Sequence, residues 1–206
     1  MATSQSVTLK LTLPEFDESH QKTYLEHQSY QQFQSQSISF KQFSQFLSCL
    51  LFMKLDDYPL PKYQYPSAGN LYPVQTYLFI KPKGIEGVEA GIYYYHPADH
   101  RLLLLSSQTS LNGEVYMGNQ TIFDRSAFSL FLIGEMKAIT PMYGKFARDF
   151  SLIEAGHIGQ LLMKAAPQQE IGLYPIDSLL FDELRDQFKL ESSQILLSSF
   201  LGGKIG

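Results

Sequence analysis

The chain has 206 residues, a length that suits one domain with a buried core. Hydrophobic residues make up 44% and charged residues 17%, with a formal net charge of −4 and no block of Lys or Arg. This balance argues against a basic nucleic-acid-binding surface. No segment approaches the roughly 20 apolar residues that span a bilayer, and the N-terminus lacks a signal-peptide pattern, so we expect a cytoplasmic protein without a membrane partner.

Alternating apolar residues predict strands, and apolar residues three or four apart predict helices. In chain order we expect an extended arm or strand over 7–13, a polar helix over 18–27, a helix over 40–52 with Ser39 as N-cap, a proline-containing loop over 54–70, a strand over 74–81, a hairpin with strands over 92–95 and 101–105, a short helix within 111–124, a strand over 127–133, a helix over 148–166, a strand-like turn over 172–176, a helix over 179–189 and a strand over 194–201. The pattern predicts an α+β fold, an antiparallel-rich mixed sheet flanked by helices. We expect a single domain over 1–206, with about 1–17 as an N-terminal arm.

The loop before the strand at 74–81 is the most informative segment. It reads Pro-Ser-Ala-Gly-Asn over 66–70. These small residues leave little side-chain bulk between the backbone and a flat ligand, so amides and a hydroxyl can reach the edge of an aromatic ring. A proline- and glycine-containing turn before a strand is also common without any ligand, and a plain turn remains the alternative.

Other patterns exclude whole classes of site. The single cysteine, Cys49, lies in an apolar helical segment, where a buried small hydrophobe is the simpler interpretation than a nucleophile. The five histidines are scattered, so we expect no metal site. The chain has no Gly-x-Gly-x-x-Gly after a strand and no phosphate-loop motif, which disfavours a dinucleotide-binding Rossmann domain.

Four motifs occur in a characteristic order. They are Pro66–Gly69 before a strand, the hairpin 91–97 with 100–102, the helical Leu152–His157, and the turn at 172–176. Together they resemble the SagB-type branch of the FMN-dependent nitroreductase fold. The similarity runs from about 24 to 204 and is greatest to the thiazoline and oxazoline oxidase domains of nonribosomal peptide synthetases.

The resemblance implies an intertwined homodimer with one FMN at each subunit interface, built partly from each chain. It also implies a peptide substrate tethered to a carrier protein, and dioxygen as the oxidant that restores the flavin. The long helix would pack near the dimer axis, where Ala155 and Gly156 permit close approach. The alternative is that this helix packs only inside its own subunit.

The resemblance places the FMN phosphate on an early segment and on the chain's last basic residue. His27, Gln28, Ser29 and Gln31 stand where the family has an Arg-Arg-Ser-x-Arg-like stretch. Ser29 matches, but the cations are missing, which would weaken phosphate binding; protonated His27 would restore part of it. Lys204 matches a basic position near the phosphate, and a solvated tail lysine is the alternative.

The same resemblance assigns the ring contacts. The residues that would line the ring edge are Pro66, Ser67, Ala68, Gly69 and Asn70. The turn at Pro175 and Ile176 would supply backbone amides to the flavin N5 side, and Asp177 stands where the family usually has glycine. If the Asp177 carboxylate pointed inward, its negative charge would repel the negative charge of reduced flavin. Otherwise Asp177 would face solvent or cap the next helix.

Catalytic residues are also carried over from the resemblance. Some azoline oxidases have a Lys-Tyr pair before the long helix, which matches Lys145 as base and Tyr143 as proton relay or substrate positioner. A lysine base needs its pKa lowered, and we expect burial against neighbouring phenylalanines to do this. Lys62 with Tyr63 is a competing pair, and ordinary loop residues remain an alternative. Glu154 and His157 are three residues apart and share a helix face, and for them we expect an interhelical hydrogen bond in the dimer core rather than catalysis.

Three functions follow from these motifs. The first is an FMN-dependent azoline oxidase that acts on a carrier-bound peptide. The second is a noncatalytic relative with a degenerate flavin site that serves as a dimerising or scaffolding domain. The third is NAD(P)H-driven reduction of nitroaromatics or quinones on the same fold.

Overall fold

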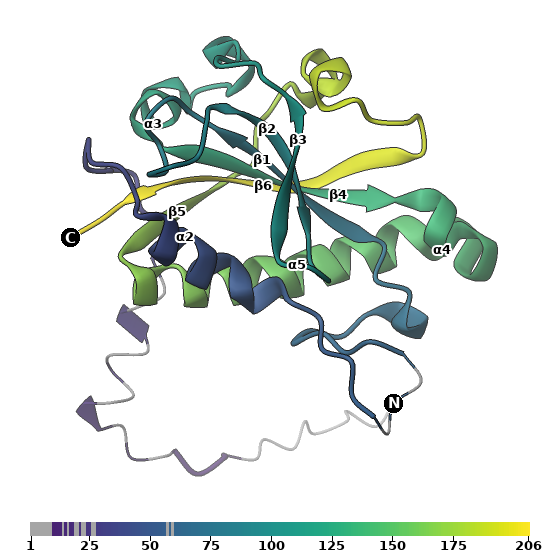
Figure 1. Cartoon of the computed structure of the whole chain (residues 1–206). Coiled ribbons are helices and arrows are strands. Elements are labelled where there is room, and N and C mark those ends of the chain that lie inside the picture. The colour runs from purple at the N-terminus through teal and green to yellow at the C-terminus, as the bar shows by residue number, and fades with distance from the viewer. Residues whose placement is uncertain are drawn as a thin grey trace, which may run out of the picture.

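A six-stranded antiparallel sheet forms the centre of the fold (Figure 1). Its strands are β1 (Val74–Ile80), β2 (Gly91–His96), β3 (Arg101–Ser106), β4 (Phe128–Glu135), β5 (Ile171–Ile176) and β6 (Gln194–Lys204), in the order β3-β2-β1-β4-β6-β5. All five pairings are antiparallel, which agrees with the predicted α+β fold and its antiparallel-rich sheet. The computed structural model describes residues 10–13, 15, 17–18, 21, 24–25, 28–56, 58 and 60–206.

Both faces of the sheet are covered. Along β1, Leu78 and Ile80 point into one hydrophobic cluster while Tyr77 and Phe79 point into the other, as the two-residue repeat of a strand requires. Helices α2 (Phe40–Leu47) and α5 (Ala147–Ala165) cover the first face. Helix α3 (Gln120–Arg125) and short 3₁₀ helices, at Gly113–Val115, Phe181–Glu183 and Arg185–Phe188, cover the second (Figure 1).

The start of α2 follows the predicted capping. The Ser39 hydroxyl accepts a hydrogen bond from the Gln42 amide at 3.2 Å, and the Gln42 side chain reaches back to Ser39. This reciprocal pair satisfies amide groups that the first turn leaves free. The α-helix ends at Leu47 and continues as a 3₁₀ turn over Ser48–Leu50, so it is shorter than the predicted 40–52.

The 92–105 hairpin and the long helix are confirmed, and other predictions need correction. The predicted helix over 179–189 is wrong: two 3₁₀ turns there set Phe181, Leu184 and Phe188 onto the sheet. The predicted turn at 172–176 is a full strand, β5, paired with β6. Helix α4 (Met136–Tyr143) was not predicted, because Pro141 inside it argues against a helix.

The N-terminal predictions fall largely outside the described residues. Residues 10–13 form no strand, and Leu11 and Leu13 are 84% and 77% exposed. Of the helix predicted over 18–27, the described residues 18, 21, 24 and 25 are helical. None of the described helices combines the length and the apolar character needed to cross a membrane.

Candidate functional site

The loop over 66–70 has an unusual backbone. Gly69, Asn70 and Tyr72 have φ of 61°, 55° and 47°, in the left-handed region. Asparagine tolerates this conformation, whereas tyrosine rarely adopts it, and such backbone is concentrated at ligand-binding sites. The Ser67 hydroxyl accepts a hydrogen bond from the Tyr72 amide at 2.9 Å and holds the loop closed. Pro66, Gly69 and Asn70 are exposed, while Ser67 and Ala68 are half-buried. We call residues 66–70 the ring loop.

Tyr143 lies against the ring loop. A Cβ atom added to Gly69 would meet the Tyr143 hydroxyl at 3.0 Å and the Met142 sulfur at 3.1 Å. Helix α4 reaches this point because it follows β4, whose Gly134 pairs with Val74 at the start of β1. The Tyr143 ring also packs edge-on against Phe150, with centroids 4.8 Å apart. The structure therefore brings the predicted relay residue together with the predicted ring contacts.

Lys145 does not have the burial that we expected of a lysine base. It is exposed in the 3₁₀ turn Gly144–Phe146, with its ammonium 5.2 Å from the centre of the Phe146 ring. Phe146 itself is 53% exposed. Burial of Lys145 would therefore have to come from outside this chain.

The competing pair lies beside a cluster of tyrosines. The Lys62 ammonium is 5.0 Å from the centre of the Tyr58 ring, and the Tyr63 ring lies 4.3 Å from that of Tyr72. Burial raises the pKa of Tyr63 to about 12, so its phenol stays protonated near neutral pH. Tyr63 can donate a hydrogen bond but is a poor base.

Glu154 is buried beneath the ring loop and not in the contact we predicted. Its side chain is 2% exposed, and its Oε1 accepts a hydrogen bond from the Val74 amide of its own chain at 3.2 Å. His157, in contrast, is exposed. Burial raises the pKa of Glu154 to about 7, and hydrogen bonds from Ser67 and Val74 offset part of that rise. Glu154 is therefore held by its own chain, and an interhelical hydrogen bond in a dimer stays a prediction for the exposed His157.

The predicted phosphate residues meet at the opposite end of the sheet. The Tyr30 amide donates to the Leu173 carbonyl of β5 at 3.0 Å, and the Gln34 amide donates to the Lys204 carbonyl of β6 at 2.9 Å. These bonds bring Gln28, Ser29 and Gln31, all exposed, to the corner that carries Lys204. We call this set the phosphate corner. His27 lies outside the described residues.

Lys204 is not the solvated tail lysine that was the alternative. It is the last residue of β6, and its ammonium contacts the Glu170 carboxylate at 2.6 Å and the Gln42 amide oxygen at 3.1 Å. The Gln42 amide nitrogen also donates to Glu170, at 2.9 Å. Hydrogen bonds from Lys204 and Gln42 lower the pKa of the Glu170 carboxyl. The positive charge of Lys204 is therefore already paired within the chain.

Pro175, Ile176 and Asp177 lie at the other end of β5. Ile176 is buried and pairs with Ser199, whereas Pro175 and Asp177 are exposed. No helix begins at residue 179, so Asp177 caps none there. The structure thus leaves Asp177 facing outward.

The ring loop and the phosphate corner of one chain are far apart. The loop leads into the start of β1, while the corner lies at the opposite end of the sheet beside β5, three strands away. Three strand spacings of about 4.8 Å and six residue steps of about 3.3 Å separate Val74, which follows the ring loop, from Leu173, which bonds Tyr30, by roughly 25 Å. This exceeds the length of an extended FMN molecule. One FMN is therefore too short to reach from Val74 to Leu173 of the same chain.

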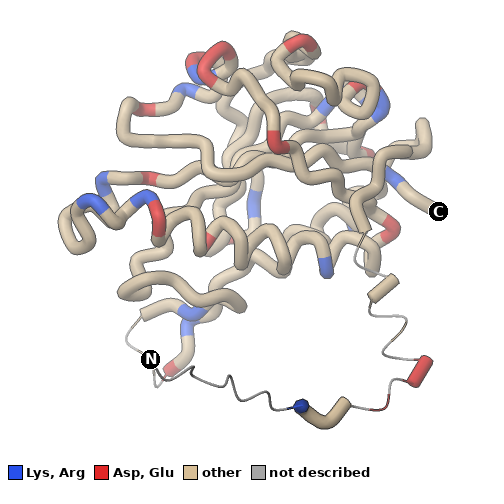
Figure 2. Tube along the Cα trace, turned by 180° about the vertical axis from the view of Figure 1, so that it is seen from behind, with Lys and Arg blue, Asp and Glu red and all other residues tan. Residues whose placement is uncertain are grey.

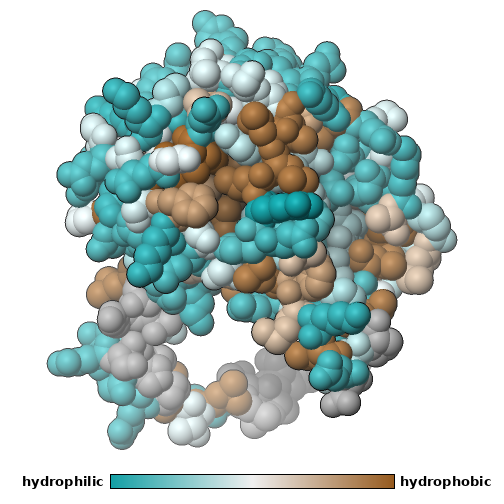
Figure 3. All heavy atoms as spheres, viewed as in Figure 1, coloured by the Kyte–Doolittle hydropathy of each residue, from teal (hydrophilic) through white to brown (hydrophobic). Residues whose placement is uncertain are grey.

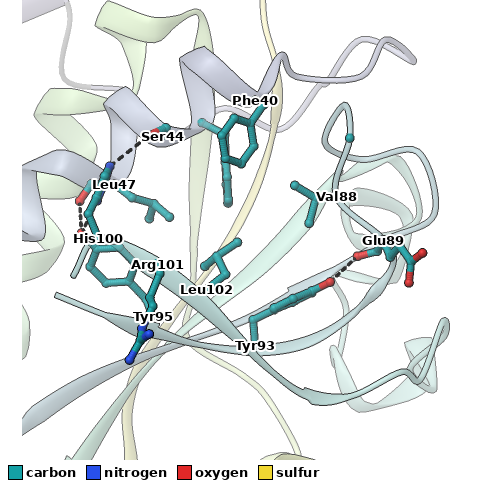
Figure 4. Close-up of a pocket in the computed structure, with 12 residues that line it drawn as sticks. Phe40, Ser44, Leu47, Val88, Glu89, Tyr93, Tyr95, His100, Arg101 and Leu102 are labelled. Atoms are coloured by element: carbon teal, nitrogen blue, oxygen red, sulfur yellow. Dashed lines mark hydrogen bonds between the residues drawn. The ribbon is translucent and has the colours of Figure 1, made fainter. Parts of the chain in front are cut away.

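A cavity of about 370 Å³ lies elsewhere, between α2 and the β2–β3 hairpin (Figure 4). Apolar side chains such as Phe40, Val88 and Leu102 form most of its wall. At one end His100 bridges the Ser44 hydroxyl at 2.9 Å and the Tyr95 hydroxyl at 2.8 Å. None of the residues predicted for the cofactor or for catalysis lines this cavity. Sequence reasoning missed it because Ser44 and His100 are 56 positions apart and form no motif.

Apolar side chains are exposed around α4 and α5. Met142 and Ile153 are 63% and 56% exposed, and the right-hand side of Figure 3 shows apolar atoms at the surface where α4 lies. Gly156 has no atom within 4 Å of the position that a Cβ would take. Helix α5 carries no Lys, Arg, Asp or Glu between Glu154 and Lys164. In Figure 2 the tube of the long helix is accordingly tan over most of its length. Within the described part of the chain, no group of three or more His, Cys, Asp and Glu could hold a metal ion.

Comparison with known proteins identifies the family. Residues 24–203 match the model of the nitroreductase family, so the chain belongs to this family. It is 32% identical over 123 residues to the indigoidine synthase of Dickeya dadantii, a match that covers 60% of this chain and 7% of that protein. The chain therefore spans a small part of this much longer relative.

Two solved structures show the same fold. A chain of the E. coli microcin synthetase McbBCD complex, determined with truncated pro-MccB17 bound, superposes with a TM-score of 0.76 at 17% identity, covering 98% of this chain and 79% of that one. A protein of Exiguobacterium sibiricum classed as a nitroreductase, determined in complex with FMN, gives a TM-score of 0.63 at 16% identity, covering 96% and 91%. At these identities the likeness shows the fold alone.

The buried carboxyl of Glu154 makes stability depend on pH. A folded-state pKa near 7, above the ordinary value of 4.5, means that the folded chain holds a proton that the unfolded chain releases over this range. The contribution of Glu154 to stability therefore falls as pH rises from about 4.5 through 7. Relative to Glu154→Gln, the free energy of unfolding of the unmodified chain should fall by about 3 kcal/mol over this window.

Urea unfolding of the flavin-free protein at several pH values measures this difference. Asp149→Asn, which removes an exposed acid from the same helix, is the matched control and should follow the unmodified chain. A difference between the unmodified chain and Glu154→Gln that stays constant with pH would contradict the assignment.

Proposed function

We propose that this chain is an FMN-dependent oxidase domain that converts a thiazoline or oxazoline ring to an azole on a peptide tethered to a carrier protein. Two copies form the working unit, and dioxygen is the final electron acceptor. Membership of the nitroreductase family and the fold shared with a peptide-binding microcin synthetase complex support the proposal. The match to part of an indigoidine synthase supports a role inside a larger biosynthetic enzyme.

The separation of the ring loop from the phosphate corner carries the proposal. Each set has the character that one part of FMN requires, yet both cannot reach one flavin from a single chain. A second copy resolves this, because the ring loop of one copy can then face the flavin whose phosphate lies on the other. The exposed side of α5 offers a contact surface, with apolar Ile153 beside Gly156, where no side chain keeps a second backbone away.

The residues fit the two ends of FMN unequally. The ring loop offers small residues, backbone amides and the hydroxyl of Ser67, which suit a flat ring. The phosphate corner offers the neutral side chains of Gln28, Ser29 and Gln31, and a lysine that is already paired with Glu170. Neutral hydrogen bonds contribute about 1 kcal/mol each against about 1.5–3 kcal/mol for charge-assisted ones. Ring contacts should therefore supply most of the affinity.

When bound, FMN would accept a hydride from the azoline ring and pass two electrons to dioxygen, giving azole and hydrogen peroxide. Tyr143 would position the substrate, since its hydroxyl lies at the ring loop. Lys145 would take the carbon-bound proton once a second copy or the substrate covers it. The turn at Pro175, Ile176 and Asp177 would contact the flavin ring and offer it backbone amides.

The noncatalytic alternative rests on one observation, the pairing of Lys204 with Glu170 at the phosphate corner. If that pairing prevents FMN from binding at all, the fold persists as a dimerising module. The third alternative, NAD(P)H-driven reduction, differs from the proposal in its electron donor.

The activity is tested with FMN-loaded protein and a carrier-bound peptide that contains a thiazoline or oxazoline, incubated in air. We expect the peptide to lose two hydrogen atoms, detected by mass spectrometry, with one dioxygen consumed per ring. Tyr143→Phe should slow the reaction by about tenfold or more. Tyr93→Phe, whose hydroxyl bonds only the Glu89 carbonyl, is the matched control and should keep the rate. Bound FMN with unchanged peptide and rapid NADH oxidation would favour the third alternative.

The phosphate corner gives a second prediction. Glu170→Gln should free the Lys204 ammonium for the phosphate and tighten FMN binding by about tenfold. Gln31→Arg, which adds a cation at the same corner, should act in the same direction. Glu191→Gln removes an equally exposed carboxylate from a different lysine pair, with Lys137, and is the matched control.

Fluorescence titration with FMN and with riboflavin measures both affinities. Riboflavin lacks the phosphate, so its affinity should stay unchanged in all three variants. An unchanged FMN affinity in both Glu170→Gln and Gln31→Arg would show that this corner does not hold the phosphate.

A further inference from the structure

The cavity between α2 and the β2–β3 hairpin has the size and the lining of a small-molecule site. Its volume of about 370 Å³ lies within the range of about 300–1,000 Å³ that such sites occupy. Apolar side chains such as Phe40, Val88 and Leu102 form most of the wall (Figure 4). The lining also has three hydroxyl groups and one imidazole, which belong to Ser44, Tyr93, Tyr95 and His100. A few polar groups in an apolar wall are typical of a site that fixes the orientation of a ligand.

The hydrogen bonds at the His100 end determine where each proton lies. The Tyr95 hydroxyl donates to the Leu47 carbonyl at 3.1 Å, because a carbonyl oxygen can only accept. Tyr95 has no second proton, so at 2.8 Å its oxygen accepts from Nδ1–H of His100. In the neutral imidazole the other nitrogen, Nε2, then accepts from the Ser44 hydroxyl at 2.9 Å. All three protons are therefore held inside this chain of hydrogen bonds.

Tyr93 is also bonded within the chain. Its hydroxyl donates to the Glu89 carbonyl at 2.8 Å (Figure 4). Burial raises the pKa of both Tyr93 and Tyr95, so the two phenols keep their protons. The hydroxyl and imidazole protons of the lining are thus all occupied. These groups present lone pairs to a ligand, and the ligand has to supply the hydrogen-bond donor.

The charged side chains of the lining do not offer a buried partner for a charged ligand. They are Arg101 and Glu89, and both are exposed. Arg101 already pairs with Asp99 at 3.0 Å, and in Figure 4 its guanidinium points away from Phe40 and Val88. A charge that enters an apolar cavity without a partner is costly. The cavity therefore favours a neutral ligand.

We propose that this cavity binds a neutral, apolar molecule that carries a hydroxyl or N–H group, with that group donating to the Ser44 oxygen and the apolar body packed against Phe40, Val88 and Leu102. A molecule with an acceptor at the same position would leave two lone pairs facing each other and would bind more weakly. The site is separate from the ring loop and the phosphate corner, so the inference does not depend on flavin binding.

A pair of probe molecules tests the proposal. 2-Naphthol has a hydroxyl donor, whereas 2-methoxynaphthalene has a similar apolar body and an oxygen that can only accept. Their dissociation constants are measured by isothermal titration calorimetry with flavin-free protein at pH 8, so that imidazole is neutral. We expect 2-naphthol to bind about three- to tenfold more tightly, the equivalent of one hydrogen bond.

Ser44→Val tests the acceptor that we assign. Valine removes the hydroxyl and covers the His100 nitrogen with a methyl group, so the preference for 2-naphthol should fall to about one. Ser48→Val is the matched control, because Ser48 donates to the Gln45 carbonyl at 2.7 Å and does not line the cavity. This variant should keep the preference of the unmodified chain.

Leu102→Trp separates this cavity from the ring loop, where a flat ring could also bind. The larger side chain fills the cavity, so both probes should lose affinity in a variant whose thermal unfolding shows that it is folded. Any of four results would overturn the inference: no binding of 2-naphthol, equal affinity for the two probes, a preference that survives in Ser44→Val, or affinities that Leu102→Trp leaves unchanged. None of them bears on the proposed flavin function.

Discussion

The spacing of strands in one rigid sheet constrains everything proposed for this protein. Antiparallel ladders hold Val74, at the start of β1, far from Lys204, at the end of β6, so the strand ends next to the ring loop and the phosphate corner stay apart. Under the proposed function each chain would supply one part of a flavin site, and a second copy would complete it.

Charge is distributed unevenly over these two parts. The phosphate corner has a lysine whose charge is offset by Glu170, while the ring loop sits above a carboxyl buried without a cation. The first feature would weaken the binding of a phosphate at this corner. In the proposed flavin site, affinity would therefore depend on ring contacts more than on electrostatic attraction to the phosphate.

Local sequence patterns predicted the elements whose cause is local. The Ser39 capping box, the 92–105 hairpin and the long helix depend on residues a few positions apart, and all three are present. The predicted helix over 179–189 failed because packing on the sheet, rather than helical periodicity, places its phenylalanines. In the candidate site, the ring loop was recognisable from its small residues. The contacts of Gly69 with Tyr143 and of Lys204 with Glu170 join residues 74 and 34 positions apart, which no local pattern specifies.

Native mass spectrometry of the protein titrated with FMN tests the central claim most directly. The account predicts that flavin appears only on a species of two chains, with up to two flavins, and that the single chain stays free of it. A single chain that carries FMN would contradict the account, because one copy would then complete the site across a distance that its sheet does not allow.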